Sequence, residues 1–312
     1  MITDNKRVIN SKLLIDANCT NEVSEIIDSI LAPGFRNKAT HCAFLPQSSS
    51  RQAFYTECFA GNTTFFPGGN FGNIAVNRTV NNILCSGATP CYLSVGFLIE
   101  EGFALADLRQ IAAAVSDAAR IAEVEIAACD FKVVKRCATG GICLTAACIG
   151  ELPPDIDLSP ENIRCGDKIF ISGDIGRHAA AVASLNEGEA TLFDTISDTA
   201  SLGDIVHNLL DVCGNDIRVL GLLSEGGVGE TIGRLESVCG ADIVLDREAI
   251  PVTPDVAAVC SRFYTDLLHC SSEGVIIAVI PESLADAALA AIRRSAHGQN
   301  AAIIGYVAGS QT

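Results

Sequence analysis

Positive charge is scarce in this sequence. The 312 residues include 21 Lys and Arg against 37 Asp and Glu, which gives a net charge of −16. Basic residues never form a run longer than two. Proteins that bind nucleic acids or anionic membranes need clustered positive charge on one surface. The composition therefore disfavours both kinds of partner.

Long apolar segments and a secretion signal are also missing. Apolar runs such as residues 275–280 fall far short of the roughly 20 residues that a membrane-spanning helix requires. The first ten residues, MITDNKRVIN, lack the apolar centre of a signal peptide. We therefore expect a soluble, cytoplasmic protein. Hydrophobic residues make up 49 % of the chain, which is enough for large cores in two domains.

Paired cysteines are absent although the chain contains 14 Cys. Zinc sites usually place two ligands two to four residues apart, and no CxxC occurs here. Cys137, Cys143 and Cys148 lie in an apolar run instead. In a chain without a secretion signal, this pattern favours buried free thiols over metal ligands or disulfides.

Acidic residues are absent from residues 65–97, FFPGGNFGNIAVNRTVNNILCSGATPCYLSVGF. Gly68 and Gly69 permit a tight turn, and a predicted helix over residues 73–84 follows Asn70. The N-terminus of such a helix can bind phosphate. A glycine pair alone is a weak indication, so both a nucleotide site and an ordinary strand-to-helix turn remain open.

The remaining pattern predicts an α+β protein in two parts. We place the boundary in the proline-rich stretch LPPDIDLSPENIRCGD, which gives domains 1–152 and 153–312. Further helices are predicted over residues 21–31, 104–124, 177–186, 201–213 and 228–239. Strands are predicted on both sides of the Ser48–Ser50 turn, over residues 91–100, 125–134 and 140–151, and before the glycine turns at 173–176 and 224–227.

Several segments together resemble the HypE family of hydrogenase maturation factors. They are FFPGGNFG, TVNNILCSGATPCYLSVGFLIEEGF, CDFKVVKR, GDKIFISGDIGRHAAA and SSEGVIIAVI, in the family's order and with similar gaps. This family belongs to the PurM-like superfamily, with aminoimidazole ribonucleotide synthetase and selenophosphate synthetase. The resemblance, over residues 54–306, implies a PurM-like two-domain α+β fold. It also implies a homodimer whose N-terminal strands form a shared β-barrel, and a C-terminal α/β sandwich.

The resemblance also implies a site for ATP and Mg²⁺. Its nucleotide contacts would be Gly68, Gly69, Asn70, Asn82, Asp130, Gly226 and Gly227, with Glu57 and Asp130 on the metal. Lys132 and Glu273 match the positions of the dehydration residues. Lys132 follows Asp130 by two residues, so both side chains lie on one face of a strand. His178 lies just inside a predicted helix, where we expect it to pack or cap.

Four positions depart from the family pattern. Glu57, Asn82 and Leu222 stand where the family has Asp, and Glu225 stands where it has Arg. Mg²⁺ demands near-ideal geometry, so the longer Glu57 and the neutral Asn82 alter the expected metal site. Glu225 would repel phosphate. Residues 1–30 lack the family's glycine-rich segment, and the sequence ends in IIGYVAGSQT without the family's cysteine tail.

In the HypE family, ATP drives the dehydration of a carbamoyl group on a cysteine to a cyanide, and a carbamoyltransferase delivers the carbamoyl. We therefore predict ATP-dependent dehydration of a carbamoyl or amide group, with the substrate supplied in trans. A carbamoyltransferase-like or scaffold protein is the expected partner. Two alternatives remain, a dimeric binding protein without ATP turnover and a repurposed small-molecule biosynthetic enzyme.

Overall fold

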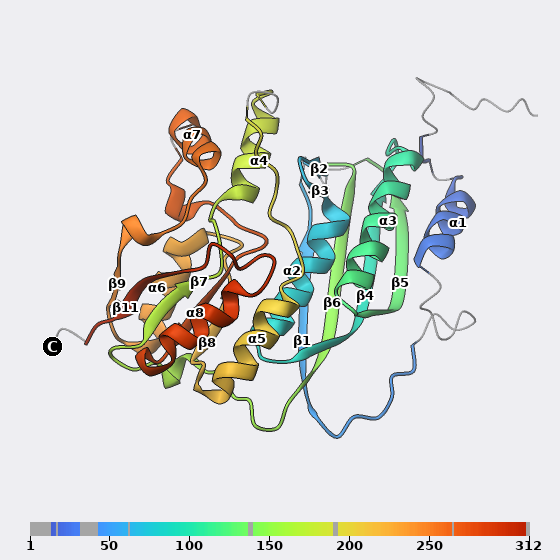
Figure 1. Ribbon diagram of the computed structural model, residues 1–312. Coiled ribbons are helices and arrows are strands. Elements are labelled where there is room, and N and C mark those ends of the chain that lie inside the picture. Colours follow the sequence, from blue (N-terminus) through green and yellow to red (C-terminus); the bar gives the residue numbers. More distant parts are fainter. Residues whose placement is uncertain are drawn as a thin grey trace, which may run out of the picture.

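The computed structural model describes residues 14–16, 18–31, 43–61, 63–136, 140–189, 193–263 and 265–309. Two β-sheets lie side by side, and each has helices of its own (Figure 1). The connection between them includes a 3₁₀ turn at Pro160–Asn162. The boundary predicted from the proline-rich stretch falls where the last strand of the first sheet ends, at Leu152. No helix among the described residues is long and apolar enough to cross a membrane.

The N-terminal sheet has four strands in the order β1-β6-β4-β5. Its strands are β1 (Arg51–Phe59), β4 (Thr89–Glu100), β5 (Glu125–Val134) and β6 (Ile142–Leu152). β6 pairs antiparallel with both β1 and β4, and β4 pairs parallel with β5 through the crossover helix α3 (Leu105–Ile121). β1 and β5 are therefore the two edges of an open sheet.

Helices cover one face of this sheet. α2 (Phe71–Cys85) and α3 lie across it, and α1 (Thr20–Leu31) packs against α3 (Figure 1). Alternate β4 side chains, at Leu93, Val95, Phe97 and Ile99, are buried beneath them. We call the opposite face the open face. Its side chains are Phe54, Thr56, Cys58, Ser94, Leu98, Asp130, Lys132, Cys143, Thr145, Ala147 and Ile149.

One predicted strand is wrong. β1 matches the second strand expected around the serine-rich turn, but residues 43–49 form no strand. Phe44 in this segment is exposed, so its apolar side chain does not pack on a core. Pairing with β6 begins only at Arg51, opposite Leu152. A strand depends on such a neighbour, which the local sequence does not reveal.

α2 begins two residues earlier than predicted because Asn70 caps it. The Asn70 Oδ1 accepts a hydrogen bond from the Gly72 N–H at 2.8 Å, and the Asn73 Oδ1 accepts one from the Asn70 N–H at 3.0 Å. This reciprocal arrangement is a capping box. Before it, β2 (Phe65–Phe66) and β3 (Gly69–Asn70) form a small hairpin.

The C-terminal sheet has five antiparallel strands in the order β8-β10-β7-β11-β9. Its strands are β7 (Lys168–Ile171), β8 (Val219–Leu222), β9 (Ile243–Leu245), β10 (Ile276–Ile280) and β11 (Ala302–Val307). Its helices are α4 (Arg177–Asn186), α5 (Gly203–Cys213), α6 (Gly227–Cys239), α7 (Pro254–Phe263) and α8 (Ala285–Arg293).

Both faces of the C-terminal sheet are buried, which explains the uninterrupted apolar sequence of β10. Ile276, Ala278 and Ile280 join one core, together with residues of α2, α5 and α8. Ile277 and Val279 join a second core, which includes residues of α6. All five residues of β10 are buried.

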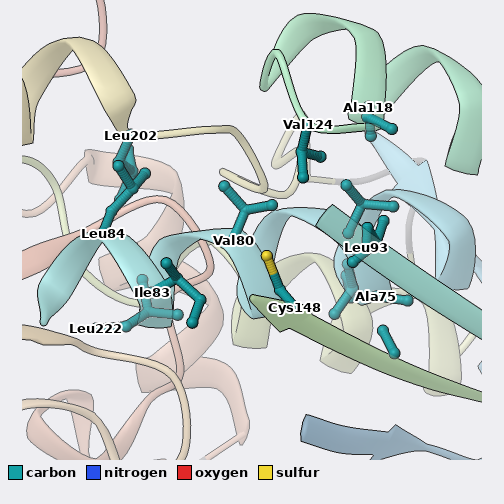
Figure 2. Packing of buried hydrophobic residues seen from close by; sticks show 14 of the residues in the cluster. Ala75, Val80, Ile83, Leu84, Leu93, Ala118, Val124, Cys148, Leu202 and Leu222 are labelled. Atoms are coloured by element: carbon teal, nitrogen blue, oxygen red, sulfur yellow. The ribbon is translucent and has the colours of Figure 1, made fainter. Parts of the chain in front are cut away.

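α2 is shared by both halves of the molecule. It contacts β1 and β6 in the N-terminal half, and β8 and α5 in the C-terminal half. Ile83 lies beside Leu222 of β8, and Leu84 lies below Leu202 at the start of α5 (Figure 2). A helix that is buried on several sides carries apolar or hydrogen-bonded side chains nearly all round.

Two asparagines of α2 bind the C-terminal half through hydrogen bonds. The buried Asn81 donates from Nδ2 to the Ala200 carbonyl and accepts from the Leu202 N–H, each at 2.9 Å. One turn earlier, the Asn77 Nδ2 donates to the Thr199 Oγ1 at 3.3 Å. Asn77 and Asn81 therefore attach residues 199–202 to α2.

Asn81→Ala is expected to lower the free energy of unfolding by about 2–4 kcal/mol, because it leaves the buried Leu202 N–H and the partly buried Ala200 carbonyl unpaired. The matched control is Asn82→Ala, which removes one hydrogen bond to the helix carbonyl of Arg78 and should cost about 1 kcal/mol or less. Urea unfolding followed by circular dichroism measures both. Equal losses in the two variants would show that Asn81 does not connect the halves.

Candidate functional site

Two carboxylates, one from each half of the molecule, meet on the side chain of Arg78. Arg78 lies in α2, Glu57 lies in β1, and Glu273 lies shortly before β10. Arg78 donates from Nε and Nη2 to the two oxygens of Glu273, at 2.9 and 2.6 Å. Its Nη1 donates to the Glu57 Oε1 at 2.6 Å. We call these three residues the carboxylate–guanidinium cluster.

The cluster is largely shielded from water. The side chains of Arg78, Glu57 and Glu273 are 13, 17 and 1 % exposed. The Tyr55 hydroxyl donates to the second oxygen of Glu57 at 2.9 Å, and the ring of Phe59 lies 5.4 Å from the Arg78 Cζ. Each of the four carboxylate oxygens thus accepts a hydrogen bond from a protein donor.

Burial and charge act in opposite directions within the cluster. Burial raises the pKa of Glu273, while the hydrogen bonds and charge of Arg78 lower it, and the net direction is upward. Burial acts to lower the pKa of Arg78, but hydrogen bonding and charge from Glu273 and Glu57 raise it overall. Arg78 therefore stays charged. Removing one partner of such a buried pair typically costs about 3–5 kcal/mol.

Glu225 is a weak fourth member of this neighbourhood. Its Oε1 lies 3.6 Å from the Arg78 Nη1, and its side chain is 82 % exposed. An exposed ion pair of this kind contributes little. Glu225, at a position where the resemblance implies Arg, nevertheless places a carboxylate next to Arg78.

A second group of polar residues lies behind Glu273. The Glu273 N–H donates to the Asp198 Oδ1 at 3.1 Å, and burial raises the pKa of Asp198. His178 shares a hydrogen bond between its Nδ1 and the Ser197 Oγ at 2.9 Å and packs edge-on against Phe66. Burial lowers the pKa of His178 to about 4. It is therefore a neutral packing residue near pH 7.

A cavity of about 300 Å³ opens beside this group. Asp198 and Gly274, the residue after Glu273, line it. Asp174, Arg177 and His297 provide further charged or polar lining. Both signs of charge face this space, so it can hold a small polar group next to the chain segment that carries Glu273.

The glycine turn before α2 packs against the C-terminal half. Gly68 has φ +95°, and a Cβ there would lie 2.9 Å from the Ser197 backbone nitrogen. The Ser197 N–H donates to the Pro67 carbonyl at 2.8 Å. This conformation requires glycine at position 68. The neighbouring Gly69 lies in β3, and Asn70 caps α2.

The second glycine turn also has a packing role. Gly226 and Gly227 have φ +71° and +58° at the start of α6. A Cβ on Gly227 would lie 2.6 Å from the Cys270 carbonyl oxygen. Leu222, at a position where the resemblance implies Asp, is buried against α2 at the end of β8.

The sequence-predicted metal ligands do not meet within one chain. In the strand register Glu57 is level with Ala146, Val95 and Cys129, and its side chain faces α2. Asp130 is one residue further along β5, so it lies on the open face at the opposite edge of the sheet. The joint Mg²⁺ site expected for Glu57 and Asp130 is therefore not formed by a single chain.

The predicted dehydration residues also lie on different sides of the N-terminal sheet. Lys132 lies with Asp130 on the open face, as their spacing predicted, whereas Glu273 lies on the helix-covered side. Asn82 follows Arg78 by one turn of α2, and its Nδ2 donates to the Arg78 carbonyl at 2.9 Å. Arg78 itself was not predicted. A signal was present, because Arg78 is the sole charged residue in positions 65–97.

The described part of the chain contains no metal centre built from protein side chains alone. No group of three or more His, Cys, Asp or Glu side chains in this part of the chain is placed to hold a metal ion. The cysteines within it are free thiols, but the expectation that they are buried holds for only some of them, because Cys58 and Cys165 are exposed. Cys137 lies outside the described residues.

Comparison with known families defines the class of protein. The N-terminal domain of AIR synthase related proteins matches residues 39–152, and the C-terminal domain of the same family matches residues 164–312. The chain is therefore an AIR synthase related protein.

Individual relatives narrow this class. The carbamoyl dehydratase HypE of Bradyrhizobium diazoefficiens is 40 % identical to this chain, over 82 % of this chain and 74 % of its own length. A crystal structure of the hydrogenase maturation protein HypE in complex with ATP superposes with a TM-score of 0.83. It is 36 % identical and covers 92 % of this chain and 84 % of its own. The chain belongs to the HypE family.

A third relative is bound to another protein. In the crystal structure of a HypE–HypF complex, the similar chain has a TM-score of 0.80 and 34 % identity, over 91 % of this chain and 93 % of its own. These similarities confirm the PurM-like two-domain α+β fold that the sequence motifs predicted.

The low pKa of His178 predicts a loss of stability in acid. In the unfolded chain histidine has a pKa of about 6.5, so below that pH the unfolded state takes up a proton that the folded state, with a pKa of about 4, does not. The free energy of unfolding should fall between these values, by about 2 kcal/mol from pH 7 to pH 5.

Urea unfolding of the wild type and His178→Gln at both pH values measures this effect. The variant should lose less stability than the wild type on acidification. Asp198 and Arg78 also act on His178 electrostatically, and both are retained in the variant. Parallel losses in the two proteins would contradict the assignment of a buried, neutral histidine.

Proposed function

We propose that this protein catalyses ATP-dependent dehydration of a carbamoyl group, as the names of its HypE relatives describe. The observation that carries the proposal is the buried Glu273, whose neighbour Gly274 lines the polar cavity, in a chain that is 40 % identical to a carbamoyl dehydratase. A relative of the same fold binds ATP. The cavity has room for a group as small as a carbamoyl.

The proposed reaction balances without a redox partner. The carbamoyl oxygen leaves on the γ-phosphoryl group of ATP, and two protons leave the nitrogen, so that S–C(=O)–NH₂ becomes S–C≡N with ADP and phosphate. The reaction therefore needs a base near the nitrogen. Glu273 is the proposed base, because burial makes its carboxylate more basic.

The remaining predicted site residues keep their proposed roles, but Asp130 and Lys132 lie away from Glu273. Gly68 is exposed, so its backbone is accessible to a nucleotide, and we retain Gly69, Asn70, Asn82, Gly226 and Gly227 as proposed neighbours of ATP. Asp130 and Lys132 lie on the open face. They join the chemistry of Glu273 only if a second copy of the chain brings them there.

The proposal predicts transfer of the carbamoyl oxygen to phosphate. The protein is incubated with ATP and a thiocarbamate-bearing peptide whose carbamoyl oxygen is ¹⁸O. Mass spectrometry should find the label in inorganic phosphate and a nitrile on the peptide. Glu273→Gln should lower the rate by about 10²-fold or more, the usual contribution of a general base.

The exposed Glu230→Gln on α6 is the matched control and should keep the wild-type rate. Absence of both ATP binding and labelled phosphate at millimolar ATP would contradict the proposal. That outcome would favour the second candidate, a dimeric binding protein without ATP turnover. The observation that favours this candidate is the pairing of Glu57 and Glu273 with Arg78, which already occupies both carboxylates.

We further propose that the open face forms the interface of a homodimer, and that a carbamoyltransferase-type protein is a partner. The open face exposes Phe54, whose relative exposure is 68 %, next to Ile149. No helix in the described part of the chain covers this face (Figure 1). Two such sheets packed together would build the shared barrel. A HypE relative in complex with HypF supports the second partner.

Phe54→Asp is therefore expected to convert a dimer into a monomer, because it would bury an unpaired charge beside Ile149 in the proposed interface. The control Ile121→Asp changes a similarly exposed apolar residue, 65 % accessible, at the end of α3 on the other side of the sheet. Light scattering after size exclusion gives the mass of each. A monomeric wild type, or equal effects of both variants, would contradict the interface.

A further inference from the structure

Charge balance at the carboxylate–guanidinium cluster depends on Arg78. Glu57 and Glu273 approach each other from different halves of the molecule with both side chains mostly buried. Two buried carboxylates that contact the same side chain repel each other, and they require a cation between them. The guanidinium of Arg78 occupies that position and contacts both, at 2.6 Å each.

Every oxygen of the two carboxylates accepts a hydrogen bond from a protein donor. Arg78 supplies three hydrogen bonds, and the Tyr55 hydroxyl supplies the fourth. A divalent cation binds carboxylate oxygens directly, so it would compete with these donors for the same oxygens. It would also approach the positive charge of Arg78 at short range.

The position of Arg78 is fixed from several sides. Its fork binds Glu273 through two parallel hydrogen bonds, the geometry that makes arginine more specific than lysine. Phe59 packs against the guanidinium, and the backbone of Arg78 lies inside α2. Little freedom remains for the side chain to move aside for an ion.

We propose that Arg78 is a resident cation that replaces a divalent metal between Glu57 and Glu273 and closes this carboxylate pair to metal ions. Glu57 then serves to hold Arg78 and, through it, the two halves of the chain. A metal that accompanies a nucleotide would have to be held by other groups. The proposal concerns cation binding alone, so it stands or fails independently of ATP turnover.

Mn²⁺ titration monitored by electron paramagnetic resonance tests this proposal without ATP. The full-length wild type, Glu57→Gln, Arg78→Ala and the double variant are compared, with Glu230→Gln as a control for binding to the acidic surface. Wild type and Glu57→Gln should bind Mn²⁺ equally. Arg78→Ala should bind it at least about tenfold more tightly, and Glu57→Gln should abolish that gain in the double variant.

Two results would overturn the proposal. One is Mn²⁺ binding by the wild type that Glu57→Gln weakens about tenfold or more, because the pair would then accept a metal in the presence of Arg78. The other is a folded Arg78→Ala variant without a Glu57-dependent gain. If Arg78→Ala does not fold, the comparison of wild type with Glu57→Gln still decides, and Arg78→Lys should exclude Mn²⁺ as the wild type does.

Discussion

The contact between one buried guanidinium and two carboxylates determines how the halves of this protein meet. Glu57 belongs to the N-terminal sheet and Glu273 to the C-terminal half, and neither can be buried there without Arg78. Because the hydrogen bonds on Glu273 form a planar fork, they fix the orientation of α2 as well as its distance. The cluster therefore stabilises the contact between the two halves, and it contains Glu273, the proposed base.

α2 makes this arrangement possible because it belongs to both cores. Its apolar residues pack on the N-terminal sheet and also against Leu222 and Leu202 of the C-terminal half (Figure 2). Its polar residues Asn77 and Asn81 bind the backbone and side chains of residues 199–202. An unpaired carboxylate on such a helix would be costly, which is consistent with the absence of Asp and Glu from this stretch.

Membership of the HypE family suggests a reaction, whereas the structure of this chain shows where its charged residues lie. The family relatives include a carbamoyl dehydratase and an ATP-bound structure, which motivate the proposed reaction. In this chain Glu57 is bound to arginine, and Asp130 lies at the other edge of the sheet. A reaction at Glu273 would have to release that carboxylate from Arg78.

The sequence by itself determined most secondary-structure elements, the two-domain fold and the family. The spacing of apolar residues and the order of motifs can be recognised in a sequence without knowing which residues are in contact. The Asp130–Lys132 spacing likewise placed both residues on one face. The strand predicted before the serine-rich turn is not formed, because pairing with β6 decides where β1 begins.

Only the tertiary structure decided what the charged and asparagine residues do. Arg78 is 21 positions from Glu57 and 195 from Glu273 in the sequence, so no local pattern reveals their contact. The resemblance implied that Glu57 and Asp130 bind one metal ion, but strand order and side-chain alternation place them on opposite faces of the sheet. Electrostatic roles depend on distance and burial, and both arise from packing of segments remote in sequence.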